Sequence, residues 1–194
     1  EDQGGSCASI KQILRWVPDE GAQRIQVLIE DLRNYWIRPG KKGRVVIFTN
    51  QRLQATHLAN GLLASGISCV HLHGKLDQHV REDVFDKFRR GMSDVLVATN
   101  VASRGLDFPD ISLVVQFNLP QTVDIYTHRI GRTGRVGQVG CALGYMGPKD
   151  RKLTDKLVEF LELNKQEVPD FLRPRAASPR RRAPVGRSRS RRRR

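Results

Sequence analysis

Three arginines at a spacing of three residues form the most concentrated set of potentially functional side chains in this sequence. They are Arg129, Arg132 and Arg135, and the glycines Gly131 and Gly134 lie between them. On a helical turn, this spacing would place the three arginines on neighbouring edges of one face. The glycines would let a ligand approach the backbone closely, and they would weaken a regular helix.

The arginine group has no carboxylate near it in the sequence, because no Asp or Glu lies between residues 125 and 146. Guanidinium groups without a local carboxylate suit a ligand with several negative charges, most simply a row of phosphates. A solvated basic loop that grips nucleic acid without specificity is the alternative explanation of the same pattern.

Four segments of the chain resemble the motifs of one family, in that family's order and spacing. Residues 128–135 resemble motif VI of the superfamily 2 helicases in its DEAD-box RNA helicase form, and residues 97–107 resemble motif V. Residues 46–50 resemble motif IV, and residues 78–81 resemble the short element named IVa. The similarity extends from about residue 8 to residue 172.

The resemblance implies that this chain brings positive charge to ATP. Arg132 and Arg135 match family positions that reach the γ-phosphate, as arginine fingers do. His128 and Arg129 match positions that stabilise a closed interface between two domains. These four residues are therefore the expected catalytic set.

Two further positions, in the segment similar to motif V, match residues that face the nucleotide. Asp107 matches the carboxylate that binds the ribose hydroxyls, although an Asp this close to Pro109 could also be a helix cap or a turn residue. Arg104 matches an interface residue, and a plain surface cation is its alternative.

Five residues match positions where the family contacts the sugar-phosphate backbone of RNA, namely Thr49, Gly74, Arg81, Thr99 and Gly105. Hydroxyls, backbone amides and cations recognise phosphate without recognising base sequence. We therefore expect binding to RNA shape and 2′-hydroxyls with little sequence preference. Ordinary strand-end and turn residues are an equally good explanation for Thr49 and Gly74.

Two parts that such an enzyme needs are absent from the sequence, a Gly-x-x-x-x-Gly-Lys-Ser/Thr loop and an Asp-Glu-Ala-Asp stretch. In the family, these parts and the Mg²⁺ ion belong to a preceding, N-terminal RecA-like domain. The chain thus resembles the second half of a composite ATP site, with RNA and that N-terminal domain as partners, and it should be inactive as an ATPase alone. A non-catalytic RNA-binding or annealing module and a DNA helicase of the wider superfamily are the alternatives.

The sequence departs from the family pattern at two places. Asn100 stands where motif V usually has Asp, and Asn118 stands where the family usually has the Asp of Tyr-Asp-Leu-Pro. Both changes are nearly isosteric, so they leave the assignment to the family intact. They bear only on how the site couples its ligands.

The composition fits one domain followed by a basic tail. The 194 residues carry a net charge of +14 and are 39% hydrophobic, which is enough for a core. Residues 173–194 hold eleven arginines and no acid, so residues 1–172 carry only +3. We expect a helicase C-terminal RecA-like domain over residues 1–172 and a disordered Arg/Ser/Pro-rich tail, which contacts RNA or serves targeting.

Other general features restrict where and how the chain works. No apolar run approaches 18 residues and no signal peptide is visible, so we expect a protein that is cytoplasmic and/or nuclear, not secreted and without a membrane partner. We also expect a monomer. The first residue is Glu, which suggests a piece of a longer protein. Cys7, Cys69 and Cys141 follow no metal-ligand spacing and are expected to be structural thiols, although a disulfide or zinc role is the alternative.

Short apolar runs alternate with amphipathic stretches along the whole body of the chain. Strands are expected over residues 10–17 (where a helical turn is also compatible), 45–48, 67–72, 94–98, 113–117 and 139–145, and helices over 20–36, 51–65, 77–90, after Pro120 and over 149–163. This alternation predicts an α/β fold, a parallel sheet with helices on both faces, and the resemblance implies the same RecA-like fold.

The expected fold also predicts where the functional residues meet. Open parallel sheets bind ligands at the carboxyl ends of their strands. Thr49, Gly74, Thr99 and the segment after Phe117 should therefore share one rim. A final resemblance concerns residues 164–172, which are similar to the end of the helicase core in the Vasa-like subgroup.

Overall fold

The computed structural model describes residues 7–18, 21–36, 43–103, 105–134 and 139–173. The strands are β1 (Ile10–Trp16), β2 (Arg44–Thr49), β3 (Cys69–Leu72), β4 (Val95–Thr99), β5 (Ile111–Gln116) and β6 (Gly140–Met146). The α-helices are α1 (Ala22–Asp31), α2 (Arg52–Ala64), α3 (Gln78–Arg89), α4 (Asn100–Ser103), α5 (Val123–Ile130) and α6 (Thr154–Leu163). Short helical turns occupy Cys7–Ser9, Leu32–Trp36, Pro148–Leu153 and Asp170–Leu172.

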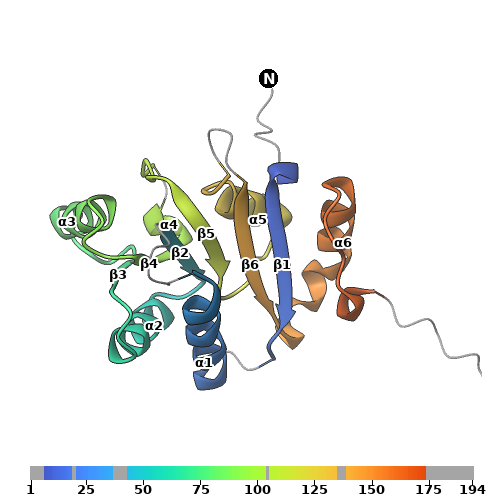
Figure 1. Cartoon of the computed structure of the whole chain (residues 1–194), viewed down its shortest axis with the longest axis horizontal. Coiled ribbons are helices and arrows are strands. Elements are labelled where there is room, and N and C mark those ends of the chain that lie inside the picture. The colour runs from blue at the N-terminus through green and yellow to red at the C-terminus, as the bar shows by residue number, and fades with distance from the viewer. Residues whose placement is uncertain (1–6, 19–20, 37–42, 104, 135–138, 174–194) are drawn as a thin grey trace, which may run out of the picture.

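The strands form one parallel sheet in the order β1-β6-β5-β2-β4-β3 (Figure 1). The apolar runs of β2, β4 and β5 occupy the middle of this sheet and are almost completely buried. Continuous burial of this kind is expected for strands with helices on both sides. The predicted RecA-like α/β fold is confirmed.

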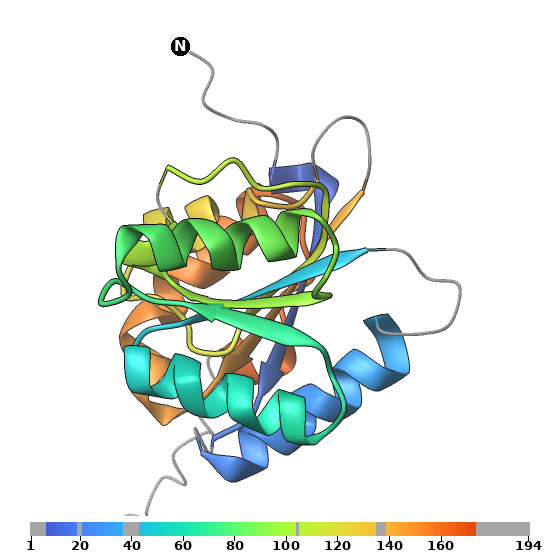
Figure 2. The same cartoon turned by 90° about the vertical axis from the view of Figure 1, so that its left-hand side faces the viewer.

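The helices cover the two faces of the sheet as separate layers (Figure 2). On one face, α1 and α2 pack against side chains of β2, β4, β5 and β6. On the other face, α3 covers β2 and β4, while α5 and α6 cover β1 and β6. Since the side chains of a strand alternate between faces, each central strand contributes to a core on both sides.

The predicted elements are confirmed with small shifts at their ends. Gly66 and Gly91 follow α2 and α3 with positive φ angles of 79° and 75°, as helix-ending glycines do. Asp77 is the N-cap residue of α3, although its side chain makes no capping hydrogen bond. Of the residues 10–17, Ile10–Trp16 form a strand, so the helical alternative is excluded there. The helix expected over residues 20–36 changes to π-helical geometry at Leu32.

Residues 164–172 lie against the outermost strand, β1, and this contact fixes their place. The Gln166 side chain accepts a hydrogen bond from the backbone amide of Gln12 at 3.0 Å. The rings of Phe171 and Trp16 lie 5.9 Å apart, and Leu172 is buried in the core that α5 and α6 form. The last described segment is therefore part of the folded body.

Two further expectations concern membrane-spanning helices and the cysteines. No helix in the described residues is both long and apolar enough to cross a membrane. Cys7, Cys69 and Cys141 are free thiols, and burial raises the pKa of Cys69 to about 11. The expected tail lies outside the described residues, apart from Arg173.

Candidate phosphate-binding site

Three strands end level with one another at one edge of the sheet. Thr49 of β2 lies opposite Thr99 of β4, and β5 ends beside them. An asparagine follows each of these strands, namely Asn50, Asn100 and Asn118. The expectation that Thr49, Thr99 and the segment after Phe117 share one rim is confirmed, and Gly74 also lies there, since a Cβ on it would be 3.5 Å from Val101 Cγ1 just beyond β4.

Arg129 brings the three asparagines together. This residue lies near the end of α5, and its side chain reaches the rim, where only 2% of the residue is exposed. Its Nε donates to Asn100 Oδ1 at 2.7 Å, its Nη2 to Asn50 Oδ1 at 2.8 Å, and its Nη1 to the backbone oxygen of Asn118 at 2.8 Å. One guanidinium thus connects the ends of β2, β4 and β5.

The acceptors of Arg129 in the described part of the chain are neutral amides and a carbonyl. Burial lowers the pKa of Arg129 to about 10, which still leaves it charged at pH 7. Its guanidinium lies 5.2 Å from the centre of the Phe48 ring, a favourable cation–π distance. Beside it, Gln116 accepts a weak bond from Nη1 at 3.4 Å, while Gln116 Nε2 is buried without a partner among the described residues. Among the described residues, the site therefore has one unpaired buried donor and no carboxylate bonded to the guanidinium.

An open pocket of about 380 Å³ exposes one side of this arrangement to solvent. Arg132 lies at its edge, with its guanidinium 5.4 Å from the centre of the Phe108 ring. Among the described residues, no Asp or Glu lines the pocket; its lining consists of Phe48, Asn100, Gly105, Ile125, His128, Arg129 and Arg132. Chemically, this donor-rich pocket suits an oxyanion such as a phosphate.

The helical geometry expected for the arginines is wrong beyond Arg129. Helix α5 ends at Ile130 and Gly131 is its C-cap, so Arg132 lies in the following turn and not on the same helical face. Arg135 lies outside the described residues. The pocket brings Arg132 and His128 together with Arg129 because the chain turns there, whereas regular spacing alone would not.

The interpretation of the glycines also needs a correction. Gly134 has a φ of 73°, and a Cβ atom there would lie 2.9 Å from Ile10 Cγ1. A Cβ on Gly140 would lie 2.5 Å from the backbone nitrogen of Gly134. Gly134 is thus required for close packing against β1 and β6. The space it leaves is filled by protein, so it does not serve the approach of a ligand.

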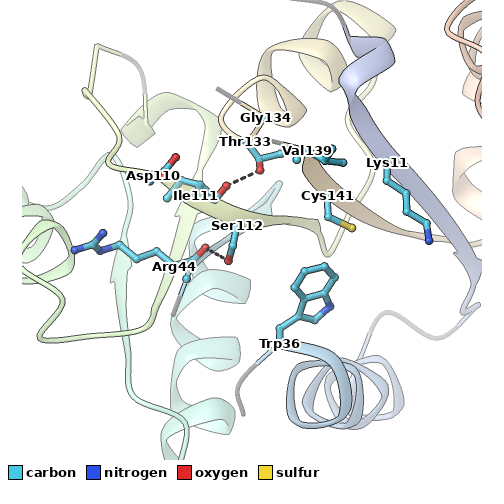
Figure 3. Close-up of a pocket in the computed structure, with 12 residues that line it drawn as sticks. Lys11, Trp36, Arg44, Asp110, Ile111, Ser112, Thr133, Gly134, Val139 and Cys141 are labelled. Atoms are coloured by element: carbon cyan, nitrogen blue, oxygen red, sulfur yellow. Dashed lines mark hydrogen bonds between the residues drawn. The ribbon is translucent and has the colours of Figure 1, made fainter. Parts of the chain in front are cut away.

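The segment after Arg132 reaches the opposite edge of the sheet, beside another cavity. Thr133 donates a hydrogen bond from its hydroxyl to the carbonyl of Ile111 at the start of β5. The adjoining cavity has a volume of about 470 Å³, and the Trp36 ring faces it across from Ser112 (Figure 3). This cavity lies at the amino ends of the strands, where sequence reasoning expected no ligand.

The structure places Asp107 and Arg81 at the same pocket. Both residues line a shallow pocket of about 330 Å³ beside α3, together with other side chains of that helix. Asp107 therefore does not line the arginine pocket, although the next residue, Phe108, lies under the guanidinium of Arg132. Arg81 itself receives support from Gln78, whose Oε1 accepts a hydrogen bond from it at 3.1 Å. Arg104 lies outside the described residues.

The remaining residues expected to contact RNA lie at or near the rim with different exposures. Thr49 is fully buried and its hydroxyl donates to the carbonyl of Gln51 at 3.2 Å, as a strand-end residue does. Thr99 is 9% exposed, whereas Gly74 lies exposed in a turn. Gly105 is exposed with a φ of 73° and lines the arginine pocket.

Sequence reasoning missed two residues of the site, Asn50 and Gln116. Asn50 lines a cavity of about 680 Å³ on the rim, which Gln51, Gln121 and Lys152 also line. Its place directly after a buried strand was the available sequence indication. Gln116 could be suspected only as the polar residue that directly follows the apolar run Leu113–Val115.

Residues 24–137 match the family model described as the helicase conserved C-terminal domain. Among curated proteins, the chain is 38% identical over 171 residues to the pre-mRNA-splicing ATP-dependent RNA helicase PRP28 of Pyricularia oryzae, covering 88% of this chain and 25% of that protein. It is 37% identical to the ATP-dependent RNA helicase ddx46 of Dictyostelium discoideum, covering 86% of this chain and 14% of that protein. The chain thus spans a quarter or less of these relatives.

Two solved structures extend the similarity to three dimensions. The RNA helicase Prp28 of Chaetomium thermophilum bound to ADP is 35% identical with a TM-score of 0.74, covering 84% of this chain and 39% of that chain. The E. coli DEAD-box protein SrmB, bound to regulator of ribonuclease activity A, is 33% identical with a TM-score of 0.70. That alignment covers 88% of this chain and 97% of the SrmB chain.

Proposed function

This chain belongs to the helicase conserved C-terminal domain family, in the form found in DEAD-box RNA helicases, and from this premise we propose that it supplies the arginines of an ATP site shared with a second domain. The observation that supports the proposal is the pocket that gathers His128, Arg129 and Arg132 without an acidic residue in its described lining. A preceding RecA-like domain would hold the phosphate loop and Mg²⁺.

The residues of the pocket divide into two roles. Arg132 lines the pocket and is partly exposed, so it can approach a phosphate and neutralise charge that develops there. Arg129 is buried and bonded on several sides, so it shapes the pocket and adds a fixed positive charge. Arg135 and Arg104 complete the proposed cationic set, and Asp107 is proposed to bind the ribose hydroxyls.

RNA is proposed to bind along the rim and beside α3. Gly74, Arg81, Thr99 and Gly105 are the proposed contacts, and Thr49 would contribute mainly by ending β2 in a fixed position. Backbone amides and cations at such a rim would hold phosphates without reading bases. When ATP and RNA bind between two domains, closure would bend one RNA strand and open a short duplex.

The subgroup, substrate and limits of the domain are further parts of the proposal. The reported relatives are named as splicing helicases or ATP-dependent RNA helicases, and support for the Vasa-like subgroup rests on residues 164–172 alone. We propose a pre-mRNA type of substrate and, of the two expected compartments, the nucleus. The folded domain would comprise residues 1–172, with residues 173–194 as a disordered RNA-binding tail and the protein as a monomer.

Titration of the chain with inorganic tripolyphosphate tests the central proposal. Backbone NMR shifts should move for residues around the arginine pocket, and Arg132→Ala should weaken binding by about tenfold, as expected for the loss of one charge-assisted contact. Lys152→Ala, which changes a cation outside this pocket, is the matched control. Equal weakening by both variants would indicate only general attraction to positive charge.

A phosphate-release assay addresses the enzymatic part. The chain alone should not hydrolyse ATP, with or without RNA, because it lacks the phosphate loop and the Mg²⁺ ligands. Turnover that stays with the chain through size-exclusion chromatography would contradict the shared-site proposal. Strand annealing without any response to nucleotide would favour the non-catalytic RNA-binding module.

A further inference from the structure

Asn50 is bonded through its backbone and through both ends of its side-chain amide. Its Oδ1 accepts from Arg129 Nη2 at 2.8 Å, and its Nδ2 donates to the carbonyl of Leu119 at 2.8 Å. Its backbone amide donates to Asn118 Oδ1 at 3.2 Å. The residue therefore links the arginine to the segment that follows β5.

Only an amide of this length can make both side-chain bonds. Arg129 requires an acceptor and Leu119 requires a donor, and the two atoms of one planar amide provide them in a fixed relation. Asp at position 50 would keep the acceptor but lose the donor, and Ala would lose both. The need for one acceptor and one donor on the same side chain therefore favours Asn at position 50. This preference does not depend on the charge of the site.

The position of Asn50 between two cavities gives these bonds a functional consequence. Arg129 lines the 380 Å³ pocket, whereas Asn50 lines the 680 Å³ cavity together with Asn118 and Leu119. Arg129 and Asn50 therefore bond to each other while they line different cavities, and through Asn50 the position of the guanidinium depends on the segment that follows β5.

We propose that Asn50 is the positioning residue of the arginine pocket, holding Arg129 in the orientation that shapes the pocket and places its positive charge there for a phosphate. This inference rests on the proposed phosphate-binding role of that pocket. Asn50 does not itself touch the ligand; it acts through Arg129. Loss of its amide should therefore alter the exposure and affinity of the guanidinium more than it alters the fold.

Hydrogen exchange at the Arg129 Nη2–H group, which donates to Asn50 Oδ1, followed by NMR on the chain, tests this directly. Asn50→Ala should speed exchange by about tenfold, the order expected when a hydrogen bond to a charged group is lost. Asn50→Asp should keep exchange slow, because the acceptor remains, while the signals of residues 119–121 shift. Gln51→Ala changes the neighbouring residue, whose side chain makes no capping bond to α2, and should have no effect.

Unchanged exchange in Asn50→Ala would overturn the proposal, as would an Asn50→Asp variant that exchanges as fast as the alanine variant. If Asn50→Ala does not fold, the aspartate variant alone still decides, because fast exchange there contradicts an acceptor role.

A second measurement separates this inference from the proposed function. In the tripolyphosphate titration, Asn50→Ala should raise the Kd by about tenfold, an effect equivalent to one charge-assisted hydrogen bond. Failure of the wild-type chain to bind would remove the phosphate role but leave the exchange result to decide on positioning. Equal affinity of wild type and Asn50→Ala would overturn the positioning role while keeping the phosphate site.

Discussion

Two buried arginines hold the end of β5 from opposite faces of the sheet, and they differ in what surrounds them. Arg24 of α1 donates to the carbonyl of Phe117 at 2.8 Å, and Arg129 of α5 donates to the next carbonyl, that of Asn118, also at 2.8 Å. Arg24 is fully buried, donates to a second carbonyl at Val17 and lies 5.8 Å from the Phe117 ring centre.

The difference between the two arginines lies in their acceptors and in access to solvent. Arg24 donates to main-chain carbonyls whose positions the fold fixes, whereas Arg129 also donates to the side chains of Asn50 and Asn100 beside an open pocket. Because its acceptors are main-chain carbonyls, Arg24 connects helix α1 to the sheet. Arg129 also depends on side chains, and substitution of those side chains can change the position of its guanidinium. Such dependence suits a functional site.

Arg24→Ala should have the largest effect on stability. It removes donors from two carbonyls, at Val17 and Phe117, and leaves a cavity where water has little access. We expect a loss of about 4 kcal/mol in the free energy of unfolding. Urea denaturation measures it, with Arg24→Lys as a control that keeps the charge without the forked geometry. A loss below about 1 kcal/mol would show that the hydrogen bonds of Arg24 contribute little to stability.

Arg129→Ala should cost less stability and remove ligand binding. Water from the pocket can solvate the amides of Asn50 and Asn100, and the penalty of burying the guanidinium disappears, so we expect a loss of about 2 kcal/mol. The same urea experiment measures this change, and the tripolyphosphate titration should show no residual binding. If Arg129→Ala costs as much as Arg24→Ala and still binds, the distinction between the two arginines fails.

Asn100→Asp should have the smallest effect, with the opposite sign. A carboxylate beside Arg129 Nε would add about 1 kcal/mol of stability at pH 7. The guanidinium lowers the folded-state pKa of that carboxyl below its unfolded value, so the gain is full above about pH 4 and disappears as pH falls through the folded pKa. Melting temperatures of both proteins at pH 7 and pH 3 measure it. A difference from wild type that does not change with pH would contradict the ion pair.

Much of the fold could be predicted because its information is local. The apolar runs of β2, β4 and β5 are continuous in the sequence, and their carboxyl ends must meet in any parallel sheet. Gly66 and Gly91 marked the ends of two helices correctly, since each has the left-handed backbone that favours glycine.

The site was less predictable because its contacts are distant in the chain. Arg129 meets Asn50 and Asn100 across 79 and 29 positions, and no spacing in residues 128–135 indicates these partners. The sequence therefore showed an arginine group but not that one member is buried. The requirement for Gly134 was equally hidden, since it comes from packing against Ile10 and Gly140.

The contact between residues 164–172 and β1 has a consequence for association between molecules. β1 is an outermost strand, and Gln166 occupies its outward-facing amide at Gln12, while Phe171 and Leu172 hold the segment in place. An uncovered strand edge is a template for pairing with a second chain. A version of the protein that ended before residue 164 would leave the Gln12 amide without this partner and expose the edge of β1 as such a template.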